Sequence, residues 1–228
     1  MNYIVIPAYQ PDNKLIKLIE KIHEKSDFRI LVIDDGSSSK CQNIFDKAEQ
    51  YATVLRHQVN QGKGQALKTA FAYIQQQNSY GTVVTADADG QHKIWDIFRT
   101  ANKASENPNK LILGVRAFTG KVPLRSRFGN SLTKALFKIQ TGVEVADTQT
   151  GLRAFTTNLI PFMLKIEGQR YEYEMNMLLE ATKEYQILEV PIETVYINDN
   201  EGSHFRPIKD GLMIYKNIFK FALSSLSS

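Results

Sequence analysis

The sequence contains a single cysteine, Cys41, among 228 residues. One cysteine excludes an intramolecular disulfide and a cysteine-based zinc site, and it is typical of a reducing compartment. The first residues, MNYIVIPAYQPD, lack the basic and long apolar regions of a signal peptide, so we expect a first strand there. No run of about 18 or more uncharged apolar residues occurs, and no transmembrane helix is therefore expected.

The sequence also carries little net charge. Its 28 basic and 24 acidic residues give a formal net charge of +4. This mild excess fits an anionic partner but is too small to indicate nucleic acid, which we do not expect as a ligand. Hydrophobic residues make up 43% of the chain, enough for a substantial core. No repeat, low-complexity tract or clear linker divides the sequence, so a single domain is expected.

Short apolar runs alternate with helical patterns along the first half. The runs typical of buried strands are residues 3–6, 30–33, 82–86 and 111–115, and the helical patterns are residues 14–25, 64–77 and 94–106. Such alternation predicts parallel strands joined by helical crossovers. Sheets of this kind bind ligands at the carboxyl ends of their strands, where the strand order switches.

The second half is less regular. Helices are predicted over residues 127–140 and 171–185, a turn-rich segment over 147–155, and short strands over 187–190 and 193–197. The polar, glycine-containing stretch 198–207 is typical of a loop.

The stretch DADGQH, residues 87–92, follows an apolar run and carries oxygen ligands at alternate positions: Asp87, Asp89 and Gln91. In an extended chain these side chains point the same way. Mg²⁺ and Mn²⁺ prefer oxygen ligands and need only one or two protein carboxylates when they also bind phosphates. A metal site is therefore predicted, with a solvated turn as the alternative. His92 either lines this site or caps the next helix.

Two further segments suggest a nucleotide. Asp35, which follows another apolar run, can accept a hydrogen bond from a base or a ribose hydroxyl, although helix capping is equally consistent with it. The stretch NQGKGQAL has Leu67 where the dinucleotide fingerprint needs a small residue, and Gly64 follows Lys63 where the phosphate loop needs Ser or Thr. It therefore predicts either a flexible helix start near a nucleotide or a structural turn.

Basic and acidic side chains in the second half suggest phosphate binding and proton transfer. Arginine binds phosphate in a bidentate manner, and the candidates are Arg116, Arg125, Arg127 and Arg206. An attacking hydroxyl needs a general base, whereas an attacking phosphate is already an anion. The candidate acids are Asp147, Glu172 and Glu174, and spacing alone does not select among them.

The segments PAYQP, VIDDGSSS, NQGKGQALKTAF, DADGQH, GVRAF, RSRFGN, DTQTGLRAF and HFRPIKDG occur in an order that resembles the inverting family 2 glycosyltransferases. The nearest resemblance is to polyprenyl-phosphate sugar synthases, the group that contains dolichol-phosphate mannose synthase. It implies an α/β GT-A (Rossmann-like) fold, in which a mixed, mostly parallel sheet is flanked by helices in one domain over residues 1–206.

The resemblance also implies roles for individual residues. The nucleotide would be bound by Pro7, Tyr9, Asp35, Lys63, Asp87 and Ala88, with Asp35 holding the base. The metal would be bound by Asp87, Asp89 and Gln91, and the phosphate of the acceptor or donor by Arg116, Arg127 and Arg206. The residues expected to be catalytic are Asp87, Asp89, Arg116 and Asp147. The family often has Asn-Glu after the first-strand tyrosine, whereas Gln10 and Pro11 stand here.

Residues 207–228 predict an amphipathic helix whose apolar stripe is flanked by Lys209, Lys216 and Lys220. Such a helix lies on an anionic membrane surface or packs on its own domain. In similar proteins this segment leads into transmembrane helices. The resemblance therefore implies a juxtamembrane helix from a longer chain.

These observations predict an enzyme that depends on Mg²⁺ or Mn²⁺ and moves a hexosyl group from a UDP- or GDP-sugar to polyprenyl phosphate. It would act at the cytoplasmic face of the cell membrane. One alternative is transfer to a glycan hydroxyl in polysaccharide synthesis, with Asp147 as base. Another is a nucleotide-sugar-binding domain without catalysis. The sequence leaves open the sugar, the base, the preferred metal and whether the chain forms a homo-oligomer.

Overall fold

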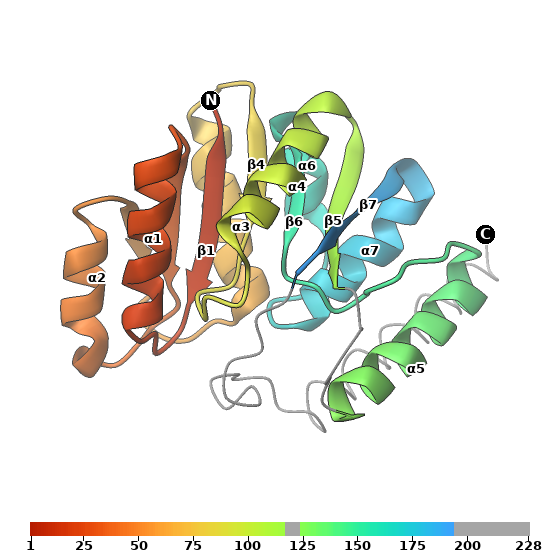
Figure 1. Cartoon of the computed structure of the whole chain (residues 1–228), viewed down its shortest axis with the longest axis horizontal. Coiled ribbons are helices and arrows are strands. Elements are labelled where there is room, and N and C mark those ends of the chain that lie inside the picture. The colour runs from red at the N-terminus through yellow and green to blue at the C-terminus, as the bar shows by residue number, and fades with distance from the viewer. Residues whose placement is uncertain (117–123, 194–228) are drawn as a thin grey trace.

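The computed structural model describes residues 1–116 and 124–193, with the backbone alone for residues 124–132. Seven strands form one sheet with helices on both faces (Figure 1). The strands are β1 (Tyr3–Ala8), β2 (Arg29–Asp34), β3 (Thr53–Arg56), β4 (Thr82–Thr85), β5 (Lys110–Arg116), β6 (Arg153–Thr156) and β7 (Gln186–Ile192). The α-helices are α1 (Asn13–Lys25), α2 (Gln42–Ala48), α3 (Lys63–Gln76), α4 (Ile94–Glu106), α5 (Leu124–Thr141), α6 (Ile160–Lys165) and α7 (Glu172–Glu184).

The sheet is mixed and mostly parallel, as predicted. Its order is β3-β2-β1-β4-β6-β5-β7, and β6 runs antiparallel to both of its neighbours. From β1 the chain adds β2 and β3 on one side and then crosses to β4 on the other, so the strand order switches between β1 and β4. Because β6 is reversed, its first residues meet the carboxyl ends of β4 and β5. This edge is where the fold predicts a ligand.

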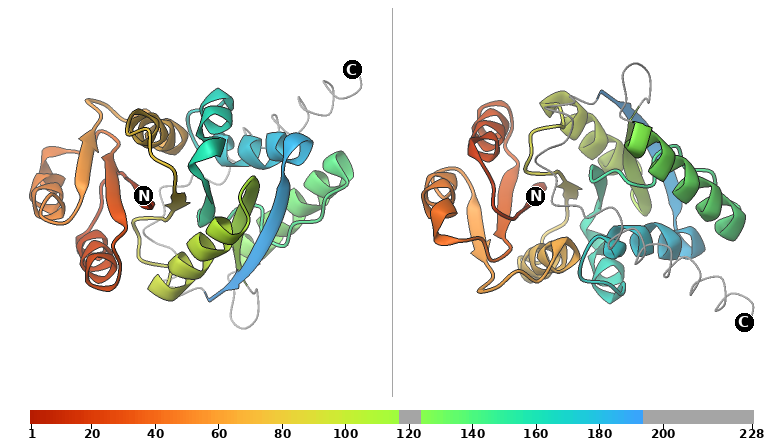
Figure 2. Two further views of the ribbon diagram at one scale, coloured as in Figure 1. Left: turned by 90° about the horizontal axis from the view of Figure 1, so that it is seen from above. Right: turned by 90° about the horizontal axis from the view of Figure 1, so that it is seen from below.

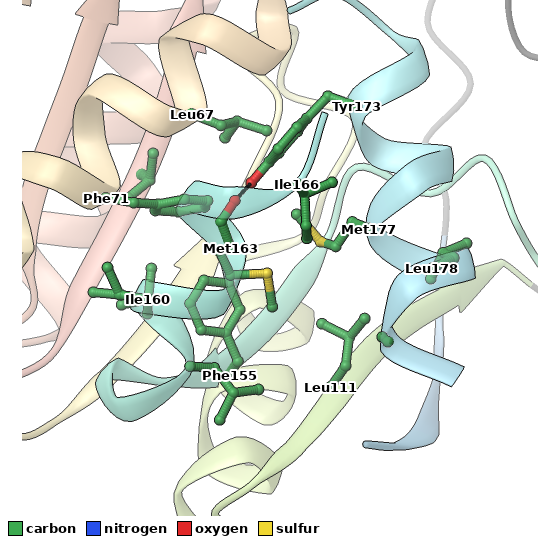
Figure 3. Packing of buried hydrophobic residues seen from close by; sticks show 14 of the residues in the cluster. Leu67, Phe71, Leu111, Phe155, Ile160, Met163, Ile166, Tyr173, Met177 and Leu178 are labelled. Atoms are coloured by element: carbon green, nitrogen blue, oxygen red, sulfur yellow. Dashed lines mark hydrogen bonds between the residues drawn. The ribbon is translucent and has the colours of Figure 1, made fainter. Parts of the chain in front are cut away.

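The core lies on both faces of the sheet because the central strands are buried at nearly every position. In β1, Tyr3 and Val5 face one side, whereas Ile4 and Ile6 face the other. The helices α3, α6 and α7 cover the first side, where Phe71, Phe155, Met163, Tyr173 and Met177 pack together (Figure 3).

The helices α1, α2 and α4 cover the second side, so the molecule has three layers (Figure 2). The buried side chains there include Leu15, Ile19, Ile22, Phe45 and Ile97.

The sequence predicted the long elements but missed four short ones. The predicted helices 14–25, 64–77, 94–106 and 171–185 are confirmed as α1, α3, α4 and α7, and 127–140 falls within α5. The helices α2 and α6 and the strand β3 were not predicted. The two helices span only seven and six residues, and β3 is a half-buried edge strand of four. The turn predicted over 147–155 is wrong from Arg153 onward, where β6 begins. The predicted strand 193–197 lies, apart from Glu193, outside the described residues.

Candidate functional site

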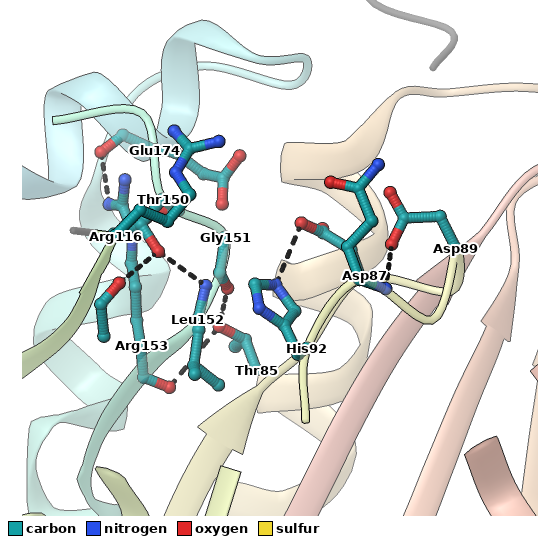
Figure 4. A network of polar contacts seen from close by, with 12 residues as sticks. Thr85, Asp87, Asp89, His92, Arg116, Thr150, Gly151, Leu152, Arg153 and Glu174 are labelled. Carbon is teal, nitrogen blue, oxygen red and sulfur yellow. Dashed lines mark hydrogen bonds and ion pairs between the residues drawn. The ribbon is translucent and has the colours of Figure 1, made fainter. Parts of the chain in front are cut away.

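The segment after β4 is a turn and not an extended chain. Gly90 has φ 73°, and Asp89 Oδ1 accepts a hydrogen bond from the Gln91 amide at 3.0 Å. The extended conformation predicted for residues 87–91 is therefore wrong, but the turn still presents both carboxylates, Asp87 and Asp89, together at the carboxyl end of β4 (Figure 4). Ala88 lies half-buried between them.

Asp87 is the centre of a network of charged groups. Lys63 Nζ, at the start of α3, lies 2.7 Å from Asp87 Oδ1 and 2.9 Å from Glu174 Oε2. His92 Nε2 lies 3.4 Å from Asp87 Oδ2. Burial opposes the charge on Asp87 and on Lys63, but their opposite charges outweigh it. The pKa of Asp87 is therefore lowered and the pKa of Lys63 is raised. His92 therefore lies against the site, and the N-cap residue of α4 is Lys93, whose side chain makes no capping hydrogen bond.

The two carboxylates of the turn suit a divalent cation. Burial, and next the charge of Asp87, raise the pKa of Asp89. A cation shared by both would relieve this repulsion. Within residues 1–116 and 133–193, no group of three or more His, Cys, Asp or Glu side chains is arranged around an ion position. Two carboxylates nevertheless fit an ion whose remaining ligands are substrate phosphates and water.

The loop before β6 closes against Asp87. A Cβ atom on Gly151 would lie 2.4 Å from Asp87 Oδ2, so only glycine leaves room for the carboxylate. Thr85 Oγ1 donates to the Gly151 carbonyl at 2.8 Å, which fixes this loop to the end of β4 (Figure 4). The antiparallel course of β6 brings Gly151 to this edge, and sequence reasoning missed its contact with Asp87.

A buried arginine lies beneath the network. Arg153 is 1% exposed, its Nε donates to the Thr150 carbonyl at 3.0 Å, and its Nη1 donates to the Glu174 carbonyl. Among the described residues, Arg153 Nη2 and Glu174 Oε1 have no hydrogen-bond partner. Burial lowers the pKa of Arg153, although nearby acids, first Glu174 and then Asp147, oppose that shift. An arginine within the apolar stretch LRAF was the signal that the sequence offered.

Arg116 and Asp147 form a bidentate ion pair at the end of β5. Arg116 Nε lies 2.5 Å from Asp147 Oδ2, and Arg116 Nη2 lies 3.0 Å from Asp147 Oδ1. The Gln149 amide also donates to Asp147 Oδ1, and Asp147 is fully buried. This carboxylate therefore fixes the orientation of Arg116, whose side chain remains 19% exposed.

The predicted nucleobase residues lie at the ends of β1 and β2. Pro7 is half-buried within β1, and Tyr9, which follows it, is 38% exposed. Asp35, at the end of β2, is 3% exposed and hydrogen-bonded to the segment 57–62.

Gln10, which stands where the family often has Asn, links the loops after β1 and β2. It has φ 50°, its amide donates to Ser37 Oγ, and its Oε1 accepts from Ser38 Oγ. The structure therefore brings the loops after β1, β2 and β4 to one edge of the sheet.

Other predicted residues have different settings. Glu172 Oε1 accepts from the Gln169 and Arg170 amides, so this acid stabilises the turn before α7. The side chains of Arg125 and Arg127 and all of Arg206 lie outside the described residues, as does the predicted helix 207–228. In the part of the chain that the structure describes, no helix is long and apolar enough to span a membrane.

Comparisons with known proteins agree with this geometry. The family model described as glycosyl transferase family 2 matches residues 3–163. The UDP-N-acetylglucosamine–dolichyl-phosphate N-acetylglucosaminyltransferase of Methanococcus voltae is 26% identical over 85% of this chain and 85% of its own. The dolichyl-phosphate beta-glucosyltransferase of Saccharomyces cerevisiae is 25% identical over 94% of this chain and 72% of its own.

Among solved structures, glucosyl-3-phosphoglycerate synthase from Mycobacterium tuberculosis, in complex with Mn²⁺, UDP-glucose and phosphoglyceric acid, has a TM-score of 0.69 at 19% identity. The superposition covers 98% of this chain and 79% of the other. At this identity the likeness establishes the GT-A fold. The family model spans most of the chain, and the conclusion is direct: this protein is a glycosyltransferase that belongs to glycosyl transferase family 2.

Proposed function

We propose that this enzyme transfers a hexosyl group from a nucleotide sugar to polyprenyl phosphate, with a divalent cation, at the cytoplasmic membrane face. This proposal rests on one observation: Asp87, Asp89 and Lys63 lie together where the strand order switches, and Arg116 lies at the end of β5. Carboxylates for a cation, a lysine for a diphosphate and an arginine for an acceptor phosphate are the groups that this reaction requires.

The donor would bind across the ends of β1 and β4. Tyr9, which is 38% exposed, and Pro7 would border a nucleobase at the end of β1. Asp87 and Asp89 would hold Mg²⁺ or Mn²⁺, which when bound neutralises the leaving diphosphate. Lys63 lies close enough to Asp87 to bind the same diphosphate. Gln91, on the turn that carries Asp89, would be a further ligand of the ion. Relatives that act on nucleotide sugars support this donor class.

The acceptor would approach from the side of β5. Arg116 is oriented by Asp147 and would align one acceptor phosphate oxygen opposite the leaving group. By their names, relatives from Methanococcus and Saccharomyces act on dolichyl phosphate, which supports a polyprenyl-phosphate acceptor. Arg127 and Arg206 are proposed as further phosphate ligands on sequence grounds.

Transfer to a glycan hydroxyl fits this site less well. A hydroxyl acceptor needs a base, and Asp147 was the candidate. Asp147 is fully buried, and Arg116 bonds to both of its oxygens. An already anionic phosphate acceptor needs no such base.

The test is a screen of UDP- and GDP-sugars with polyprenyl phosphate in the presence of Mg²⁺ or Mn²⁺. We expect one donor to yield an acid-labile sugar lipid whose formation stops when the cation is chelated. Transfer to glycan hydroxyls without any lipid product would overturn the acceptor assignment. Turnover that persists in excess chelator would overturn the role of the metal.

The membrane location has its own test. Each lysine near an anionic surface contributes about 1 kcal/mol, so we expect the three lysines of residues 207–228 to give salt-sensitive binding to anionic liposomes. Changing Lys209, Lys216 and Lys220 to Glu should weaken binding and transfer to long-chain acceptors, but not transfer to a short soluble acceptor. Unchanged liposome binding would mean that this segment does not carry the protein to the membrane.

A further inference from the structure

Glu174 carries a buried carboxylate oxygen that has no partner among the described residues. This acid lies in the first turn of α7 and is 8% exposed. Its Oε2 lies 2.9 Å from Lys63 Nζ, whereas Oε1 makes no hydrogen bond to any residue that the structure describes. The helix dipole favours an acid in this turn but does not explain why the acid is buried. Because a buried acceptor without a partner is costly, such an atom calls for a functional explanation.

The contacts of Glu174 place its carboxylate beside the groups assigned to the donor. Lys63 Nζ bridges Glu174 Oε2 and Asp87 Oδ1, at 2.9 and 2.7 Å. In Figure 4 the Glu174 side chain points toward Asp87 from the side of the site that holds Arg116 and Arg153. In the proposed reaction the hexosyl group lies between the diphosphate at Lys63 and the acceptor phosphate at Arg116. Glu174 therefore lies where the hydroxyls of that group need acceptors.

We propose that Glu174 binds the transferred sugar, with Oε1 accepting a hydrogen bond from one hydroxyl of the hexosyl group while Oε2 stays with Lys63. A small rotation about the terminal torsion, which is soft in glutamate, brings Oε1 to the accessible side of the side chain. This assignment rests on the proposed nucleotide-sugar donor and adds the residue that selects the sugar. Such a site rejects a donor that lacks the hydroxyl, because the carboxylate oxygen is then left unpaired.

The alternative is a structural role for the same oxygen. Among the described residues Arg153 Nη2 is also buried without a partner, and Arg153 Nη1 donates to the Glu174 carbonyl. A movement of either side chain that joins Nη2 to Oε1 would satisfy both atoms within the protein. A structural Glu174 supports every donor equally, whereas a sugar-binding Glu174 distinguishes donors by a single hydroxyl. Donor analogues therefore separate the two roles.

The first experiment varies the donor and leaves the protein intact. We would titrate UDP-glucose and UDP-N-acetylglucosamine into the wild type with Mg²⁺ present, or GDP-mannose if only guanine nucleotides bind. The donor that binds most tightly is then compared with its monodeoxy analogues, each of which lacks one sugar hydroxyl. We expect one analogue to bind at least about tenfold more weakly than the parent donor. Equal binding of every analogue would overturn the proposal.

The second experiment changes Glu174 itself. In Glu174→Gln the amide oxygen stays with Lys63, which only donates, so the amide nitrogen takes the place of Oε1. The variant should bind the parent donor about tenfold more weakly and lose most of its preference over the sensitive analogue, because the charge-assisted bond is gone. Affinity for UDP or GDP alone should not fall, since the Lys63 contact persists. Equal losses for the nucleoside diphosphate and the nucleotide sugar would overturn the proposal.

Glu180→Gln is the matched control for this variant. It removes a carboxylate from the same helix, where Glu180 forms a surface ion pair with Lys183, and it should change neither affinity. Melting temperatures show whether both variants fold, and if Glu174→Gln does not, the monodeoxy donors decide on the wild type. If the wild type binds no nucleotide sugar, the proposed function fails. If it binds one but distinguishes no analogue, the role of Glu174 alone fails.

Discussion

Lys63 Nζ lies 2.7 Å from Asp87 Oδ1 and reaches Glu174 Oε2 at 2.9 Å. Three elements therefore meet through one ammonium group: the start of α3, the turn after β4 and the first turn of α7. This lysine therefore links the turn after β4 to helix α7. It also balances two carboxylates that lie largely out of water, where unpaired charges are costly.

The first prediction follows from that balance. Lys63→Met leaves Asp87 and Glu174 without their shared cation, which should lower the free energy of unfolding by about 1–3 kcal/mol. Mg²⁺ or Mn²⁺ should then raise the melting temperature of the variant more than that of the wild type, because the ion takes over the charge on Asp87. Thermal denaturation with and without the ion measures this.

Lys63→Arg is the control for the loss of charge. It keeps a cation beside Asp87 and should melt closer to the wild type. Equal metal-dependent shifts for the wild type and Lys63→Met would contradict a metal site at Asp87.

The second prediction separates the charge of Asp89 from its turn. Asp89→Asn can keep the hydrogen bond that Oδ1 accepts from the Gln91 amide, so the turn should persist. Because the charge is lost, the metal concentration for half-maximal transfer should rise by at least about tenfold. Asp89→Ala removes the turn bond as well and should abolish transfer. If Asp89→Asn transfers the sugar at the wild-type rate when the metal concentration is limiting, Asp89 is not a metal ligand.

Much of the fold was predictable because the central strands are buried on both faces. Runs such as residues 3–6 and 111–115 are apolar at every position, which indicates a parallel sheet covered by helices. The segments VIDDG and TADADG end two such strands, so their placement at one edge also followed from the sequence.

The remaining features depend on contacts between residues distant in the sequence. Nothing local in LRAF indicates that β6 is antiparallel, and its orientation is what brings Gly151 onto Asp87. The hydrogen bonds of Asp35 depend on the path of residues 57–62, and the pairing of Glu174 with Lys63 depends on how α7 packs. Acidic residues in YEYE indicated a polar helix start, but not the partner of either glutamate.

The third prediction concerns Asp147. Asp147→Asn removes the charge of the fully buried carboxylate that Arg116 binds through two nitrogens, and it should cost about 3 kcal/mol of stability. For a chain of this length the melting temperature should fall by about 10 °C. Transfer should also decline through loss of acceptor affinity, since Arg116 is no longer held in place.

Two controls accompany the Asp147 variant. Glu144→Gln removes an acid from an exposed ion pair with Lys138 and should change stability little. The double variant Asp147→Asn with Arg116→Met should lose less stability than the sum of the two single variants, because both changes remove the same ion pair. If Asp147→Asn and Glu144→Gln have the same melting temperature, the ion pair between Arg116 and Asp147 does not stabilise this edge of the sheet.

The fourth prediction concerns the contact between Gly151 and Asp87. Gly151 is not among the residues with positive φ, so its backbone accepts alanine. The new Cβ would lie 2.4 Å from Asp87 Oδ2 and must displace the carboxylate, which also bonds to Lys63 and His92. We expect the KM for donor and the metal requirement to rise by about tenfold, because small displacements at a reacting centre carry large costs.

Gly142→Ala is the matched control for this substitution. Gly142 has φ 71° with no atom within 4 Å of a built Cβ, so alanine there should cost about 1 kcal/mol of backbone strain and leave the KM values unchanged. Gly151→Ala should show the reverse pattern, with a small change in melting temperature and a large loss of donor and metal affinity. If Gly151→Ala keeps wild-type KM values, Asp87 tolerates the displacement and its position is not what binds the donor and the ion.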